Sequence, residues 1–297
     1  MKKILLILVL ILLLPSLCWS QGQITRPKKT ESTKNETPKR TPKTNQILSK
    51  STLPNSTETI NGITVHWNGV TRNQKSVITN LLNNMVYVQG GSFMMGSNDS
   101  DSYSYGNPYM NEEPVHHERV SSFLIDKYEV TQKLWQAVMG NNPSHFKGEN
   151  LPVEEVSWND CQDFIKKLNR LTGLIFRLPT EVEWEYAARG GNKSNGYKYS
   201  GSNNIDKVGW YEGNSGSKTH SVGSKTPNEL GIFDMSGNVE EWTSDKYSSN
   251  YNSPRNSSRY VFRGGNCYFS SMSARVTSRN HFDPPYRSSG LGFRLVL

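Results

Sequence analysis

The sequence predicts a single loop-rich domain of the α+β class, and three observations predict it. Amphipathic helical patterns begin at Ser157 and at Thr180, each with the signature of a helix start. Segments 85–96 and 120–130 alternate apolar and polar residues as strands do. Seven Trp and 24 Gly are spread over short segments, which is typical of a fold with many turns.

Two shorter elements precede these helices, and one more strand follows them. A helix is expected over 74–84, where apolar residues recur at helical spacing. Another is expected after Thr131, a residue suited to the N-cap, and it stops at Gly140. The last strand is expected over 293–296.

The two clearest helices begin with capping boxes, in which an N-cap Ser or Thr is followed three residues later by an acidic residue. Ser157 forms such a pair with Asp160, and Gly173 ends the helix. A second capping box at Thr180 opens a helix that stops at Gly190.

Residues 1–20 have the pattern of a secretory signal. Lys2 and Lys3 precede an apolar run over 4–14, and Ser20 is a small residue suited to cleavage. These eleven apolar residues are too few to span a bilayer, which takes about 20. We therefore expect a protein without a transmembrane segment that is exported to the periplasm, the cell surface or the medium.

Residues 21–60 are expected to form a disordered basic linker, because they hold almost no large apolar side chains. This tract carries eight Lys or Arg against three Glu. Together with the two lysines of the signal, it leaves only about +1 of the formal net charge of +8 for residues 61–297. Nucleic-acid binding by the folded part is therefore not expected. Residues 61–84 are interpreted as a short helical lead-in, and 85–297 as the main domain.

The segment 230–242 places several oxygen-bearing side chains around Gly237, which lets the backbone fold sharply. A hard cation such as Ca²⁺ prefers such ligands, about six to eight oxygens in all. An EF-hand is excluded, because Val239 stands where that motif needs glycine. The alternative is a polar turn before a buried Trp242. The oxygen-bearing residues are Asp234, Ser236, Asn238, Glu240 and Glu241.

Six motifs in a fixed order together resemble the formylglycine-generating-enzyme family, also called the sulfatase-modifying-factor domain. The resemblance covers about residue 85 to the C-terminus. It implies an irregular, lectin-like fold related to C-type lectins, in which the two ends of the domain pair near each other. The motifs are G-G-S-F-M-M-G-S (90–97), V-S-W-N-D (156–160), R-L-P-T-E-V-E-W-E-Y-A-A-R-G-G (177–191), N-E-L-G-I-F-D-M-S-G-N-V-E-E-W (228–242), R-G-G-N (263–266) and G-F-R-L (292–295).

The resemblance also implies structural Ca²⁺. In the family one Ca²⁺ is held by groups that match the side chains of Asp234 and Glu241 and the backbone carbonyls of Gly237 and Val239. A second family site begins at an Asn-Ile pair that resembles Asn204-Ile205.

The family's catalytic residues are missing. Its enzymes carry two cysteines after R-G-G that bind Cu(I), and the copper activates O₂ to oxidise a substrate cysteine. Counted from Arg263, the matching positions here are Phe269 and Ala274. Neither side chain can hold copper, so we expect no copper site and assign no catalytic residue.

The cysteines leave two questions open. Cys161 and Cys267 either form a disulfide in the oxidising compartment or stay separate, as a buried apolar residue and a lone thiol. Lipidation of Cys18 is also open, since Leu17 stands where a lipidated cysteine needs a small residue.

Two functions follow from the resemblance. The first is a non-catalytic, exported module that binds a protein or glycan partner in the cell envelope. The alternative is a formylglycine-generating oxidase that acts on a cysteine of a sulfatase-like client. A partner is expected in the groove that the family forms from segments matching 266–269 and 280–289, with Asn266, Cys267, Tyr286 and Arg287 as contacts. The plain alternative is a surface loop that packs its own aromatic residues.

Overall fold

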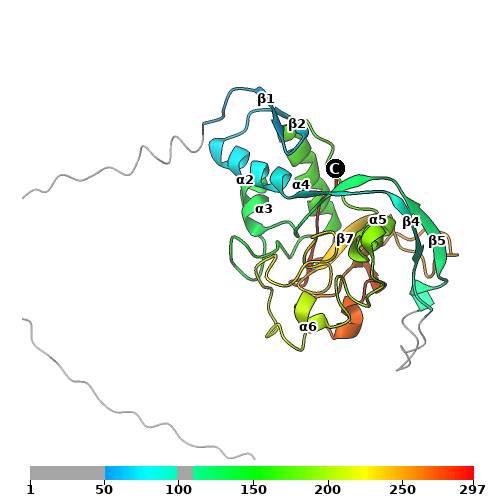
Figure 1. Ribbon diagram of the computed structural model, residues 1–297. Coiled ribbons are helices and arrows are strands. Elements are labelled where there is room, and N and C mark those ends of the chain that lie inside the picture. Colours follow the sequence, from blue (N-terminus) through cyan, green and yellow to red (C-terminus); the bar gives the residue numbers. More distant parts are fainter. Residues whose placement is uncertain (1–50, 99–109) are drawn as a thin grey trace, which may run out of the picture. The chain divides into compact units, whose positions relative to one another are not determined.

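The computed structural model describes residues 51–98 and 110–297 (Figure 1). The expected signal at 1–20, lipidation at Cys18 and residues 21–50 of the expected linker lie outside these ranges. Among the helices within them, none is both long and apolar enough to span a bilayer.

A β-hairpin stands where the sequence analysis expects the end of the linker. β1 (Ser56–Ile60) pairs antiparallel with β2 (Ile63–Trp67). Asn61 and Gly62 connect them with φ angles of 50° and 76°, as a tight two-residue hairpin turn requires. Residues 56–60 are therefore a strand. Ile63, Val65 and Trp67 of β2 are buried, and backbone pairing holds the polar β1 beside this strand.

Three of the predicted helices begin at the predicted N-caps, and the helix expected over 74–84 is observed at 72–83. Thr131, Ser157 and Thr180 are N-caps, and each side chain accepts a backbone N–H of the first turn. Gly140 and Gly173 end two helices in the left-handed conformation. The helices are α2 (Arg72–Asn83), α3 (Gln132–Met139), α4 (Trp158–Thr172), α5 (Glu181–Ala188) and the short α6 (Ile205–Val208), with 3₁₀ turns at Met110–Glu112, Gly191–Lys193 and Ser271–Ala274.

The remaining strands form one four-stranded sheet and two separate pairs. In the sheet the order is β10-β7-β8-β9, with β10 parallel to β7 and the other neighbours antiparallel. Its strands are β7 (Glu240–Lys246), β8 (Tyr260–Arg263), β9 (Arg279–Phe282) and β10 (Leu291–Gly292). The pairs are β3 (Met85–Val88) with β6 (Phe123–Asp126), and β4 (Gly91–Met95) with β5 (His116–Val120).

The C-terminal segment closes the fold beside β6. The N–H of Asp126 donates to the carbonyl of Leu295 at 2.8 Å, and Leu124 donates to Leu297 at 3.2 Å. Because β6 pairs with β3, the end of the chain lies next to the first strand of the main domain, as expected. The segment predicted as a strand over 293–296 makes single bridges instead, and β10 comes just before it.

The main hydrophobic core lies between the hairpin, α2, α3, α4 and the four-stranded sheet. Trp135 of α3 stacks on Phe164 of α4 at 5.2 Å, and Phe293 meets the edge of this pair. A second cluster surrounds Trp184 of α5. This helix packs against β4, β5, β7 and β8, and Figure 1 shows it beside β4 and β7. Helices and antiparallel strands thus share one core, as the predicted α+β class requires.

Candidate functional site

The oxygen-rich segment 230–242 makes a sharply reversed turn. Asp234, Gly237 and Asn238 have φ angles of 59°, 88° and 63°, in the left-handed region that non-glycine residues rarely adopt. A Cβ at Gly237 would lie 2.3 Å from the carbonyl oxygen of Trp210. The glycine is therefore required by close packing as well as by its backbone angle.

Glu241, one of the two expected calcium carboxylates, is fully engaged by protein groups. Arg294 donates to it through Nη2 (2.6 Å) and Nε (2.7 Å), and Trp184 donates through Nε1 (2.7 Å). All three side chains are buried. This carboxylate is therefore neutralised by a guanidinium.

Asp234, the other expected carboxylate, is only partly satisfied. Its Oδ2 accepts the N–H of Gly223 at 2.6 Å, whereas Oδ1 is buried and has no hydrogen-bond partner. Burial raises the pKa of Asp234 to about 6. An unpartnered buried carboxylate oxygen is an atom that a cation would satisfy.

Two further carboxylates, Asp126 and Glu129, lie in the same buried region. Glu129 accepts Asn238 Nδ2 at 2.7 Å and the N–H of Val239 at 3.1 Å. Burial raises the pKa of Asp126 to about 8. Burial, with the negative charges of Asp234 and Glu241, raises the pKa of Glu129 well above its ordinary value. The sequence analysis missed this acidic cluster, although both residues lie within the strand predicted over 120–130.

The expected calcium ligands therefore fit a cation in part. The unpartnered oxygen of Asp234 could bind a cation. Glu241 is already paired with Arg294, so it is not free to bind one. Within residues 51–98 and 110–297, no group of three or more His, Cys, Asp or Glu side chains is arranged to hold a metal ion. At the second expected site, Asn204 is the N-cap of α6, and Ile205 is buried against Val208 and Ala274.

The positions of the family's catalytic cysteines hold no reactive group. Phe269 is 45% exposed, and Ala274 is buried beside Tyr199. Cys161 and Cys267 are both buried and unpaired, so the disulfide alternative is wrong and the two cysteines are separate. Burial raises the pKa of Cys267 to about 12. Its thiol therefore stays protonated at neutral pH. Copper binds the thiolate form, so Cys267 does not offer a copper ligand.

The two segments of the expected groove lie side by side, but their predicted contact residues differ in access. The hydroxyl of Tyr268 and that of Ser289 are 3.0 Å apart, which joins the segments. Asn266 is buried and donates to Glu240 at 2.8 Å, and Cys267 is buried next to it. These two residues are therefore not accessible to a partner.

The outer part of the groove carries aromatic and charged side chains. Tyr286 stacks on Phe282 with ring centroids 3.7 Å apart, and Phe282 is 39% exposed. Arg287 is half-exposed and donates to both oxygens of Asp160 at 2.8 and 2.9 Å. This bond ties the loop to the start of α4, since Asp160 also completes the capping box of that helix.

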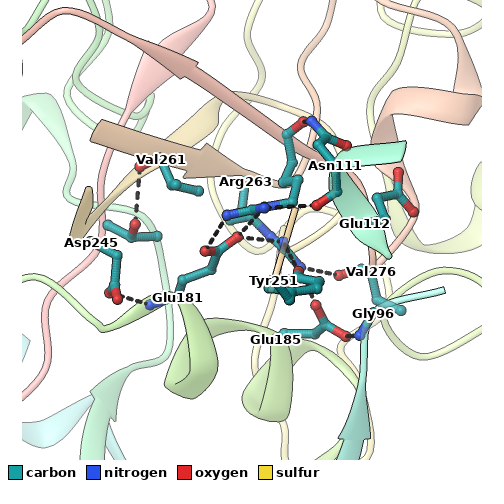
Figure 2. A network of polar contacts seen from close by, with 12 residues as sticks. Gly96, Asn111, Glu112, Glu181, Glu185, Asp245, Tyr251, Val261, Arg263 and Val276 are labelled. Carbon is teal, nitrogen blue, oxygen red and sulfur yellow. Dashed lines mark hydrogen bonds and ion pairs between the residues drawn. The ribbon is translucent and has the colours of Figure 1, made fainter. Parts of the chain in front are cut away.

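A buried network of ion pairs joins the R-G-G motif to α5 (Figure 2). Arg263 of the R-G-G motif donates to Glu181 at 2.9 Å and also bonds Glu185, one turn further along α5. Arg279 binds both oxygens of Glu181 at 2.7 Å. Burial opposes ionisation of Glu185, but Arg263 and Arg189 hold its pKa below the ordinary value. The sequence analysis missed these pairs, because the partners lie at least 78 residues apart.

Comparisons with known proteins identify the family. A family model described as "Sulfatase-modifying factor enzyme 1-like domain" matches residues 71–297. The chain therefore belongs to the sulfatase-modifying-factor family, which is also called the formylglycine-generating-enzyme family. No individual activity follows from this membership, because relatives within the family carry different functions in their names.

Three relatives and one solved structure illustrate this spread. "Chaperone protein LppX" of Paenibacillus barcinonensis is 35% identical over 73% of this chain and 90% of the relative. The "Formylglycine-generating enzyme" of Streptomyces coelicolor is 28% identical over 70% of this chain and 87% of that enzyme. "Inactive C-alpha-formylglycine-generating enzyme 2" of Mus musculus is 32% identical over 56% and 55%. The structure of "Treponema denticola variable protein 1" superposes with a TM-score of 0.63, at 31% identity, over 82% of this chain and 99% of that one.

The structural likeness confirms the predicted fold. The chain has the irregular lectin-like α+β fold of this family, which it also shares with a structure named PvdO from Pseudomonas aeruginosa.

Proposed function

We propose that this protein is exported and acts as a non-catalytic module that binds a protein or glycan partner in the cell envelope. The observation that carries the proposal is the chemistry at 269 and 274. An exposed Phe269 and a buried Ala274 replace the copper-binding cysteines, and both described cysteines are buried. Copper chemistry needs thiolates that this site does not offer.

The relatives' names support a binding role and favour a protein partner. The Paenibacillus barcinonensis relative is named a chaperone, and the Mus musculus relative is named inactive. The exposed aromatic and arginine side chains of the outer groove are of the kind that dominate recognition surfaces. The expected signal at 1–20 supports export.

The absence of catalysis can be tested directly. The protein is incubated with Cu(I), O₂ and a cysteine-containing sulfatase-motif peptide, with the Streptomyces coelicolor enzyme as positive control. We expect an aldehyde only in the control, measured by mass spectrometry of the peptide. An aldehyde formed by this protein would overturn the proposal and restore the oxidase alternative.

The location of the partner site can be tested by pull-down from envelope extracts. We compare wild type with Tyr286→Ala/Arg287→Ala and with the control Tyr87→Ala/Arg72→Ala, which alters an exposed tyrosine and an exposed arginine elsewhere. Partners should be lost with the first variant and kept with the control. If the first variant recovers the same partners as wild type, the groove is not the binding site.

We also propose that the turn at Asp234 holds a structural Ca²⁺, with carbonyl oxygens of Gly237 and Val239 as further ligands. A cation that binds only the native state at 100 times its Kd adds about 2.7 kcal/mol of stability. EDTA should therefore lower the melting temperature of wild type and leave Asp234→Asn unaffected. Glu241→Ala is unsuitable as a test, because it would leave the guanidinium of Arg294 buried and unpaired. Equal melting temperatures of wild type with EDTA and with Ca²⁺ would exclude the site.

A further inference from the structure

A cavity of about 530 Å³ lies away from the groove, between α2, the segment that leads from β6 into α3, and residues 221–222. This volume is within the range of small-molecule sites, about 300 to 1,000 Å³. The cavity does not include any residue of the outer groove or of the family's catalytic positions. Its lining is Ser76, Val77, Asn80, Leu81, Asn84, Asp126, Tyr128, Glu129, Thr131, Lys133, Leu134, Asn150, Ser221 and Val222.

Carboxylates line the inner part of this cavity. Asp126 is 4% exposed and accepts the N–H of Tyr128 at 3.2 Å. The backbone of Lys127 supplies a further hydrogen bond. Part of the capacity of Asp126 is still free, since a carboxylate accepts about four hydrogen bonds. Glu129 is 1% exposed beside it. Both residues are thus buried acceptors that border an open space.

A third carboxylate, the proposed Ca²⁺ ligand Asp234, lies close to the cavity without lining it. Val222 lines the cavity, and the next residue, Gly223, donates its N–H to Asp234 Oδ2. Asp234 Oδ1 is buried and unpartnered, and the charge of Asp234 acts on Glu129. In this region the single guanidinium of Arg294 therefore acts on four buried carboxyl groups, those of Asp126, Glu129, Asp234 and Glu241.

The neighbouring cations balance these carboxyl groups only in part, although Arg294 lowers the pKa of Asp126 and of Glu129. Arg294 is committed to Glu241 by bonds of 2.6 and 2.7 Å. Lys133 lines the cavity but pairs with Glu149 at 3.0 Å, where both side chains are more than half-exposed. A ligand that enters the cavity would bring the missing charge.

We propose that this cavity binds an alkylammonium group. An ammonium offers three donors and a positive charge to Asp126 and Glu129. Leu81 and Leu134 are buried apolar side chains on the walls, suited to an aliphatic stem. The group comes either from a free small amine or from a lysine side chain of a partner protein, which present the same chemistry.

The test measures binding of n-pentylammonium and of its neutral analogue 1-pentanol by isothermal titration at about pH 9. At this pH Asp126, with a pKa of about 8, is ionised, and an alkylammonium keeps its proton. EDTA is present so that no divalent cation competes. A charged hydrogen bond in a buried site should make pentylammonium bind at least about tenfold more tightly than pentanol. Equal affinity for the two ligands, or no saturable binding of pentylammonium, would overturn the proposal.

Variants locate the binding. Asp126→Asn keeps the shape and removes the charge, so it should weaken binding about tenfold. Ser76→Trp fills the cavity from an exposed helix position and should abolish binding without disturbing the carboxylates. The control Asp163→Asn alters an exposed carboxylate of α4 and should bind as wild type does. Unchanged binding by Ser76→Trp would place the amine elsewhere and contradict the proposal, even if Asp126→Asn does not fold.

The source of the ammonium is distinguished with a capped lysine, Nα-acetyl-lysine-N-methylamide. If it binds at least as tightly as pentylammonium, the cavity takes a lysine side chain. If it binds more weakly, the cavity takes a free amine. Either result supports an alkylammonium site.

Discussion

Arg263 and Arg294 have no exposed side-chain surface, and each bonds carboxylates from a distant part of the chain. Arg263 holds α5 against β8 (Figure 2), and Arg294 holds the C-terminal segment against β7. A buried ion pair adds little net stability, because each ion loses its water. The effect of these residues is to decide which segments meet, and the motifs R-G-G and G-F-R contain them for that reason.

The network around Arg263 gives a sharp prediction at this scale. Arg263→Leu should lower the free energy of unfolding by about 3 kcal/mol. Two buried carboxylates, Glu181 and Glu185, would each lose one of their two guanidinium partners. The matched control is Arg259→Leu, whose guanidinium lies 3.7 Å from Asp283 with both side chains about half-exposed. That surface pair should contribute less than about 1 kcal/mol. Urea unfolding of both variants measures the difference, and equal losses would contradict the structural role of Arg263.

At the scale of elements, Gly140 and Gly173 end α3 and α4 in the same left-handed conformation but in different surroundings. A Cβ at Gly140 would contact nothing within 4 Å, whereas one at Gly173 would lie 2.9 Å from Cβ of His66. Gly140→Ala should therefore cost about 1 kcal/mol, from backbone strain alone.

Gly173→Ala should cost more than Gly140→Ala, because α4 must also shift away from β2. The two free energies of unfolding, measured in urea, decide this. Equal losses of unfolding free energy would mean that α4 and the hairpin can move apart without any cost in stability.

The helices were predictable from sequence because their signals are local. Thr131, Ser157 and Thr180 cap the turns that follow them, and the two glycines stop what precedes them. Strands pair with segments that are far away in the sequence. The alternation of apolar and polar residues therefore predicted strands, but it could not predict which strands pair. The hairpin at 56–67 was missed although Asn61-Gly62 is a local turn signal, because the polar composition of β1 resembles that of the linker before it.

The candidate site was predictable only in part, for the same reason. The motif spacing places Phe269 and Ala274 where the family's cysteines would stand, without any knowledge of the fold. The sequence could not show that Asn266 and Cys267 are buried, or that Glu241 faces Arg294. Those facts depend on contacts between segments that are far apart in the chain.

At the scale of the whole molecule, the folded unit is larger than the family model. The match begins at residue 71, yet the hairpin before it belongs to the main core. Val65 and Trp67 are 0% and 1% exposed, and the N–H of Asn68 donates to Leu171 of α4 at 3.0 Å. The hairpin is therefore an integral layer over α2 and α4.

A truncation series tests this directly. A chain that begins at residue 71 loses the buried side chains of Ile63, Val65, Trp67 and Val70. At about 1.5 to 3 kcal/mol for each large apolar side chain, the loss is comparable to the whole stability of a domain, about 5 to 15 kcal/mol. We therefore expect 51–297 to unfold cooperatively and 71–297 to be largely unfolded. Trp67→Ala in 51–297 should lie between them, about 3 to 5 kcal/mol less stable. Urea unfolding followed by tryptophan fluorescence ranks the three, and a 71–297 chain as stable as 51–297 would show that the hairpin is only an appendage.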